Sequence, residues 1–215
     1  MAARRDSEAK PGQGSKMAKS ASVLLDFLKA HAPAEDLVPY DAATLSATAE
    51  LAHKILLRHK AGESLVSVKN VAGIERQGRA MSVVTVINDN MPFLFNSVMG
   101  EITQSVGEPT LVLHPVLAVK RGKSGVSELL GDTGPGKADD GVDRVSLIHV
   151  HIPRQSDAEC KALAERLKGV LKKVRAAVTD WKPMLARLDQ AISDFRYAPV
   201  PMAEKDVAEA IAFLE

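Results

Sequence analysis

At residues 81–106 the chain reads MSVVTVINDNMPFLFNSVMGEITQSV, a stretch whose hydrophobic period changes at a polar turn. Residues 81–88 are almost continuously apolar and rich in β-branched side chains, which is typical of a strand buried on both faces. From 92 to 106 apolar residues recur every three or four positions, and this spacing predicts an amphipathic helix. Pro92 fits a first helical turn, and Gly107 marks the end of the helix. The stretch therefore predicts a buried strand that runs through a turn into a helix.

Further strands and a long helix extend this pattern along the chain. Residues 110–120 (TLVLHPVLAVK) and 145–152 (VSLIHVHI) read as strands, with a bulge or an edge at Pro115, because proline cannot donate to a ladder. Residues 157–178 have the apolar face of a helix. The order of strand, helix, strand, strand and helix predicts an α+β fold with a ferredoxin-like βαββα sheet covered by helices. Its last strand is either missing or replaced by a candidate strand at 64–70.

Helical and polar segments flank this unit. Residues 20–31 and 41–60 carry apolar residues at helical spacing, and Asp41 is a candidate N-cap. Residues 183–195 and 203–214 read as shorter helices. The expected organisation is a disordered lead-in at 1–19, N-terminal helices at 20–62, an α/β domain at 63–180 with a mobile loop at 121–144, and a helical extension at 181–215.

One apolar face of the strand at 145–152 must be shielded from water by another part of the protein or by a partner. Val145, Leu147 and His149 lie on this face, opposite the apolar set that the other helices are expected to cover. An apolar sheet face of this kind is not left open to water. We expect either a second copy of the chain or the N-terminal helices to cover it.

Composition excludes several classes of partner. The 28 basic and 27 acidic residues give a formal charge of +1, so the chain has no net field that would attract nucleic acid. No apolar run approaches the roughly 20 residues that span a bilayer, and we expect no membrane contact. Cys160 is the only cysteine, so no intrachain disulfide can form, which agrees with a cytoplasmic location.

Two motifs resemble known sites without meeting their chemical requirements. Residues 131–138 (GDTGPGKA) approach a phosphate-binding loop, but Ala138 stands where the motif needs a hydroxyl group for Mg²⁺. His149 and His151 share one strand face, and His114 could supply a third metal ligand. We interpret the first motif as a flexible loop and the histidines as packing residues, so the sequence predicts neither a metal site nor catalytic residues.

The polar turn at 88–91 is the candidate binding site, and its residues are Asn88, Asp89, Asn90 and Met91. Helix amides that begin near Met91 could meet the carboxylate of an effector, because a helix N-terminus attracts anions. Alternatively, Asp89 and Asn90 cap the helix with their side chains. The sequence leaves both alternatives open, because a cap and an anion site use the same amides.

Four segments carry a resemblance to a known family: VINDNMPFLFNSVMGEI, LVLHPVLAVKR, SLIHVHI and VLKKVRAAVTDWKPMLARL. They resemble the amino-terminal region of the large bacterial NAD-specific glutamate dehydrogenases, and the likeness covers about residues 81–188. Asn90 and Asn96 stand where the family usually has aspartate, and His151 where it usually has glutamate. These departures weaken any inference that a carboxylate role of the family applies at these three positions of this chain.

The resemblance implies an ACT-like domain, a regulatory module that binds amino acids or mediates assembly. The parent enzyme would oxidatively deaminate L-glutamate to 2-oxoglutarate, and its NAD would bind to downstream domains, with no cofactor in this segment. Expected partners are those downstream domains, further copies in a homo-oligomer and an amino-acid effector. The chain stops inside a predicted helix, so we expect a truncated fragment. The alternative is a free-standing ACT-like amino-acid-binding or scaffold protein.

Overall fold

The computed structural model of the chain describes residues 13–132, 141–197 and 201–214. By their contacts the residues form two units, Met1–Leu171 and Lys172–Glu215. No helix among the described residues has the length and apolar character needed to cross a membrane. The elements are α1 (Gln13–Ala30), α2 (Ala34–Leu37), α3 (Ala42–Leu56), β1 (Ser64–Arg76), β2 (Arg79–Asp89), α4 (Leu94–Val106), β3 (Leu111–Leu113), β4 (Val116–Gly122), β5 (Gly125–Asp132), β6 (Asp143–Pro153), α5 (Asp157–Tyr197) and α6 (Glu204–Leu214).

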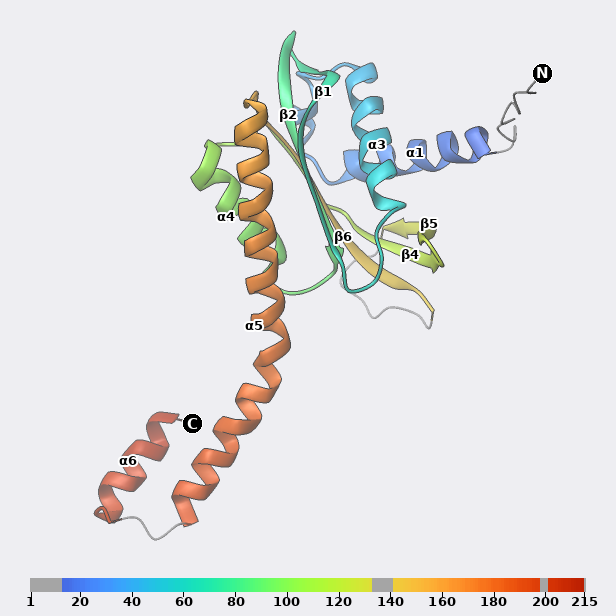
Figure 1. The fold of residues 1–215 in the computed structure, drawn as a ribbon. Helices are drawn as coiled ribbons and strands as arrows, with labels where there is room; N and C mark the ends of the chain where they lie inside the picture. Colours follow the sequence, from blue (N-terminus) through green and yellow to red (C-terminus); the bar gives the residue numbers. More distant parts are fainter. Residues whose placement is uncertain (1–12, 133–140, 198–200, 215) are drawn as a thin grey trace, which may run out of the picture. The chain divides into compact units, whose positions relative to one another are not determined.

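The first unit is built on one antiparallel sheet with the strand order β1-β2-β6-β4-β5 (Figure 1). Strand β3 also pairs with β6. Strand β6 lies at the centre, between β2 on one side and β3 and β4 on the other. The α+β class and the ACT-like sheet are confirmed. The candidate strand at 64–70 is the start of β1, which pairs with β2 as one edge of the sheet.

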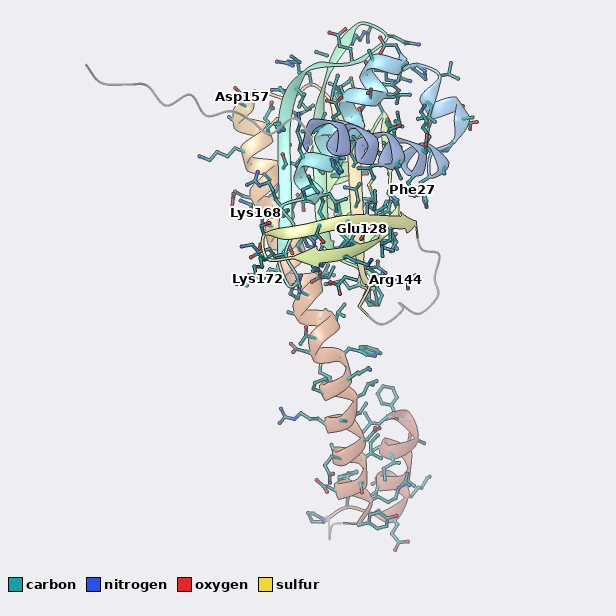
Figure 2. All side chains as sticks on the ribbon, turned by 90° about the vertical axis from the view of Figure 1, so that its right-hand side faces the viewer. Phe27, Glu128, Arg144, Asp157, Lys168 and Lys172 are labelled. Carbon is teal, nitrogen blue, oxygen red and sulfur yellow. The ribbon has the colours of Figure 1, made fainter. Side chains whose placement is uncertain are left out.

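Helices cover both faces of this sheet (Figure 1). On one face, α4 and the first turns of α5 pack against alternate residues of β2 and β6, including Val86 and Ile148. On the other face, Leu24 of α1 and Leu45 of α3 belong to the same core as Leu147. Figure 2 views the unit from this second side, with Phe27 of α1 and Glu128 of β5 labelled.

The second face of β6 is fully buried. Val145, Leu147 and His149 have no exposed surface, and the N-terminal helices supply the apolar side chains that cover Val145 and Leu147. Helix α3 begins at the predicted cap, where the Thr44 amide donates to Asp41 Oδ1 over 2.6 Å. Coverage by the N-terminal helices, one of the two expected arrangements, is confirmed.

Pro115 interrupts the predicted strand at 110–120 and separates β3 from β4. Its carbonyl oxygen still accepts a hydrogen bond from the Leu147 amide, over 3.1 Å, so the segment stays attached to β6. The irregularity predicted at Pro115 is therefore confirmed. Its cause is the missing N–H group of proline.

The segment at 121–144 was expected to be a mobile loop, and this is wrong for its first part. Residues Gly125–Asp132 form β5, which pairs with β4 as the second sheet edge. Only Val126 and Leu129 of this strand contribute to the core, so its apolar signal is weak. Gly125 has φ +139°, and a Cβ there would collide with the Leu57 carbonyl oxygen. Residues 133–140, with most of the phosphate-loop-like motif, lie outside the described residues.

The separate helix expected at 183–195 is also wrong, because α5 continues through Pro183 to Tyr197. A proline inside a helix removes one hydrogen bond and crowds the carbonyl group four residues earlier. The helix nevertheless continues on both sides of Pro183, so the loss of this hydrogen bond does not end it. Helix α6 agrees with the segment predicted at 203–214.

Two histidines lie in the core between β6 and α3, and neither has exposed surface. His149 Nδ1 is 3.0 Å from Thr85 Oγ1, and His151 Nε2 is 3.3 Å from Thr48 Oγ1. Their other ring nitrogens have no hydrogen-bond partner among the described residues. Burial lowers the pKa of His151 to about 4 and the pKa of His149 well below its ordinary value. Both rings are therefore neutral at pH 7 and serve as packing residues.

We predict that Leu147→Ala lowers the free energy of unfolding by about 2–5 kcal/mol, because it opens a cavity between β6 and the N-terminal helices. Leu130→Ala is the matched control, since Leu130 on β5 is 41% exposed and should lose less than about 1 kcal/mol. Urea denaturation at neutral pH measures both variants. Equal losses would contradict the packing of α1 and α3 on this face.

A second prediction concerns acid. In the folded chain the pKa of His151 is about 4, against an ordinary value of 6.5, so the unfolded chain binds more protons between these pH values. The stability that His151 contributes is complete above pH 6.5 and is lost as the pH falls towards 4, by on the order of 3 kcal/mol.

Urea denaturation of the parent chain and of His151→Gln, repeated across this window, measures the effect. The variant should lose less stability than the parent between the two ends of the window, whatever its stability at pH 7. Identical pH profiles for the two proteins would show that His151 is not held neutral by burial.

Candidate functional site

The predicted binding turn begins with the last two residues of β2. Asn88 is buried, and its Oδ1 accepts a hydrogen bond from Ser64 Oγ over 2.5 Å. Its Nδ2 donates to the Asp89 carbonyl oxygen over 2.7 Å. Asn88 thus joins the start of β1 to the end of β2, and its amide group is engaged within the protein.

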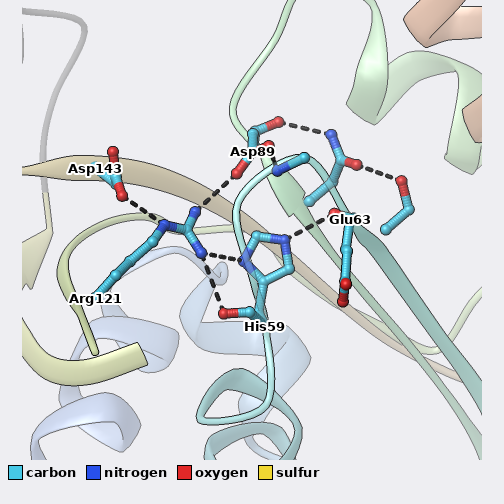
Figure 3. A network of polar contacts seen from close by, with 8 residues as sticks. His59, Glu63, Asp89, Arg121 and Asp143 are labelled. Atoms are coloured by element: carbon cyan, nitrogen blue, oxygen red, sulfur yellow. Dashed lines mark hydrogen bonds and ion pairs between the residues drawn. The ribbon is translucent and has the colours of Figure 1, made fainter. Parts of the chain in front are cut away.

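Asp89 belongs to a polar network that we call the Arg121 cluster: His59, Asp89, Arg121 and Asp143 (Figure 3). Arg121 Nη2 lies 2.7 Å from Asp89 Oδ1, and Arg121 Nε lies 2.5 Å from Asp143 Oδ2. The other oxygen of Asp89 accepts from the Gly62 amide over 2.6 Å. The cluster therefore ties together the α3–β1 connection, the end of β2, β4 and the start of β6.

His59 completes the cluster as a neutral, fully buried imidazole. Arg121 Nη1 donates to His59 Nδ1 over 3.2 Å and to the His59 carbonyl oxygen over 3.1 Å. Because Nδ1 accepts, the ring proton lies on Nε2, which donates to the Glu63 carbonyl oxygen over 2.9 Å. Burial lowers the pKa of His59, and the Arg121 charge lowers it further. The cluster thus contains one guanidinium group, two carboxylates and no positively charged imidazole.

The expectation that Asp89 caps the helix is wrong. Helix α4 begins at Leu94, and its N-cap position is Phe93, which has φ +65° and no side-chain cap. The amide of Asn90 donates to the Arg144 carbonyl oxygen over 2.9 Å, so this amide does not face a ligand. Met91 packs against the core on the α4 side of the sheet. Helix α4 starts three residues after Met91, so the helix amides that were expected to begin near Met91 begin near Leu94.

The three histidines of the possible metal set do not converge. His114 lies on the opposite sheet face from His149 and His151, where it hydrogen-bonds Ser146 Oγ over 2.9 Å and stacks on Phe95. Within the described ranges, no three histidine, cysteine or acidic side chains come together as metal ligands. Cys160 is buried, with its Sγ 3.9 Å from Ser82 Oγ, in a packing position.

Sequence reasoning did not find the Arg121 cluster. Its members come from four segments, at positions 59, 89, 121 and 143, so no local spacing connects them. The one available signal was the polar end of an apolar strand, where Asp89 follows the buried stretch at 81–88. That signal pointed to the turn at 88–91, but the partner of the Asp89 carboxylate is Arg121 and not a helix amide.

Comparison with known proteins supplies the family. A family model described as "Glutamate dehydrogenase, ACT1 domain" matches residues 24–167, from α1 to the first turns of α5. An NAD-specific glutamate dehydrogenase of Halomonas elongata is 33% identical over 134 residues, which are 61% of this chain and 8% of that protein. The corresponding protein of Pseudomonas aeruginosa is 29% identical over 136 residues, 62% of this chain and 8% of its own length.

The matched part of the chain thus spans less than a tenth of each of these curated relatives. No solved structure matches the chain. The family model, by contrast, covers the whole sheet and both of its helical layers, which is more than half of the chain. The chain therefore belongs to the family of glutamate dehydrogenase ACT1 domains.

Proposed function

We propose that this chain is the non-catalytic N-terminal regulatory and assembly segment of a large cytoplasmic NAD-specific glutamate dehydrogenase. The observation that carries the proposal is the match to the ACT1 domain together with two relatives named as such enzymes. The parent would convert L-glutamate to 2-oxoglutarate by oxidative deamination. Its NAD and its catalytic residues would belong to domains beyond this segment, since the match covers 8% of each relative.

The use of polar groups in the first unit supports a structural role. His149 and His151 are packed as neutral rings, and Asp89 and Arg121 hold segments of the fold together. A catalytic acid or base needs access to a substrate, and the two histidines lack it because neither has exposed surface. His149, His151, Asn88 and Asp89, which the sequence singled out, are thus engaged in contacts within the domain.

The second unit supports the assembly part of the proposal. Several of its large apolar side chains are exposed, and the most exposed are Trp181, Met184, Tyr197 and Phe213. Exposed apolar surface of this kind marks contact with another protein surface. We assign it to downstream domains of the same polypeptide and to further copies in a homo-oligomer.

We predict that the purified chain does not reduce NAD in the presence of L-glutamate. The assay is the absorbance of NADH, with a mock purification as background and a full-length NAD-specific glutamate dehydrogenase as positive control. Turnover above background would overturn the non-catalytic assignment. The length of the native gene product tests the rest of the proposal, because a native product of 215 residues would favour a free-standing ACT-like protein.

A further prediction separates a structural from a sensing role at Asp89. Asp89→Asn should lower the free energy of unfolding without ligand by about 1–3 kcal/mol, because it removes the charged acceptor of Arg121 and Gly62. Asp143→Asn is the matched control. Its carboxylate also contacts Arg121 but is 52% exposed, so the loss should stay below about 1 kcal/mol. Urea denaturation measures both losses.

The amino-acid effector expected at 88–91 stays a prediction. Melting temperatures of the parent chain with millimolar amino acids test it, and Asn90→Ala is the informative variant. An amino acid that raises the melting temperature of the parent, but not of Asn90→Ala, would place an effector at the turn. No stabilisation by any amino acid, together with a large loss in Asp89→Asn, would leave the turn a structural element only.

A further inference from the structure

A second polar concavity lies at the other end of β2 from the Arg121 cluster. It is a hollow of about 560 Å³ where the β1–β2 hairpin meets the end of β6. Arg76, Arg79 and Arg154 line it together with Met81, Thr110 and Pro153. We call it the arginine pocket. Its volume is within the range of about 300–1,000 Å³ that is usual for small-molecule sites.

The charges of the arginine pocket are unbalanced. Its lining contains three arginines and no carboxylate. Among the described residues, none of these three guanidinium groups forms an ion pair, whereas Arg121 and Arg166 do. Arginine forks bind carboxylate and phosphate groups in two-point geometry, so a lining of this kind favours an anion.

The hairpin places two of these arginines in an arrangement that does not serve stability. Arg76 and Arg79 are directly opposite each other in the β1–β2 register. Like charges in such a cross-strand pair are destabilising. The turn between them is tight, since Gln77 and Gly78 both have positive φ, at 50° and 74°. The fold thus holds two like charges close together, and a bound anion would relieve their repulsion.

Arg76 supplies a second, independent observation. Its Nε is buried and has no hydrogen-bond partner among the described residues. Buried polar groups are normally paired, and an unpaired one calls for a reason. A bound anion would compensate the charge of this guanidinium group, whose Nε has no acceptor of its own among the described residues.

One lining residue of the pocket, Thr110, is held to the core by three hydrogen bonds. Thr110 Oγ1 donates to the His151 carbonyl oxygen over 3.1 Å and lies 3.0 Å from the hydroxyl group of Tyr40. The Thr110 amide also donates to the His151 carbonyl oxygen, over 2.8 Å. These bonds tie Thr110 to the core, while the exposed Pro153, with the largely buried Met81 beside it, offers apolar surface next to the charges.

We propose that the arginine pocket binds a small organic anion that carries at least two carboxylate or phosphate groups. Three guanidinium groups can neutralise several negative charges, and the volume exceeds the needs of a single inorganic ion. The apolar wall suits the carbon skeleton of such a ligand. The site is separate from the turn at 88–91 and does not depend on the activity of the parent enzyme.

Isothermal titration calorimetry of the 215-residue chain tests the proposal with three probes: citrate as a polycarboxylate, ATP as an organic polyphosphate and adenosine as an uncharged control. Citrate or ATP should bind once per chain, more tightly as the salt concentration falls, and adenosine should not bind. Comparison of citrate with ATP distinguishes the two anionic groups.

Arg76→Gln and Arg154→Gln should each weaken binding by about tenfold or more, because each removes charge-assisted hydrogen bonds. Arg58→Gln is the matched control, since Arg58 is exposed and lies outside the pocket lining, and it should bind like the parent. Arg79→Gln replaces an exposed residue and keeps the test valid if Arg76→Gln fails to fold. No binding of citrate or ATP at millimolar concentration, or equal weakening by Arg58→Gln, would overturn the proposal.

Discussion

Burial of β6 on two faces and two edges is the constraint on which the first unit depends. The strand pairs with β2 on one edge and with β3 and β4 on the other, and residues 145–152 are all buried. A strand in this position can satisfy its backbone only within the sheet and its side chains only against helices on both sides. The two helical layers are therefore a requirement of this one strand, and the ACT-like core cannot be separated from its N-terminal helices.

This central burial also decides the chemistry of the polar residues around it. Histidines on the inner face of β6 are desolvated, which disfavours their charged form and makes them shape-filling groups. Along β2 and β6, charged residues lie only near the ends of the strands. At one end Arg121 is neutralised by Asp89 and Asp143, while at the other end the lining of the arginine pocket contains no acidic residue. The two ends of the sheet thus differ in electrostatic character. The charge of Arg121 is balanced by carboxylates of the protein, whereas the lining of the arginine pocket supplies no negative charge.

Local patterns were sufficient where one segment determines its own structure. The strand and helix within 81–106, the cap at Asp41 and the interruption at Pro115 all follow from neighbouring residues. Prediction failed where distant segments decide. Strand β5 has too few apolar residues to be recognised alone and depends on its pairing with β4. Pro183 is a different case, because a local rule predicted a helix end there and the helix continues through it. The Arg121 cluster and the arginine pocket could not be predicted, because each assembles residues from several parts of the chain.

The strand order has a consequence for how the protein is made. Strand β2 is complete at Asp89, but its central partner β6 starts only at Asp143. Ribosomes add about 5–20 residues per second, so several seconds pass before β6 can emerge and pair. During that interval the β1–β2 hairpin and the N-terminal helices exist without the strand that joins their layers. Their apolar faces are exposed during that interval, so this stage of synthesis is the one at which the chain is most prone to aggregation.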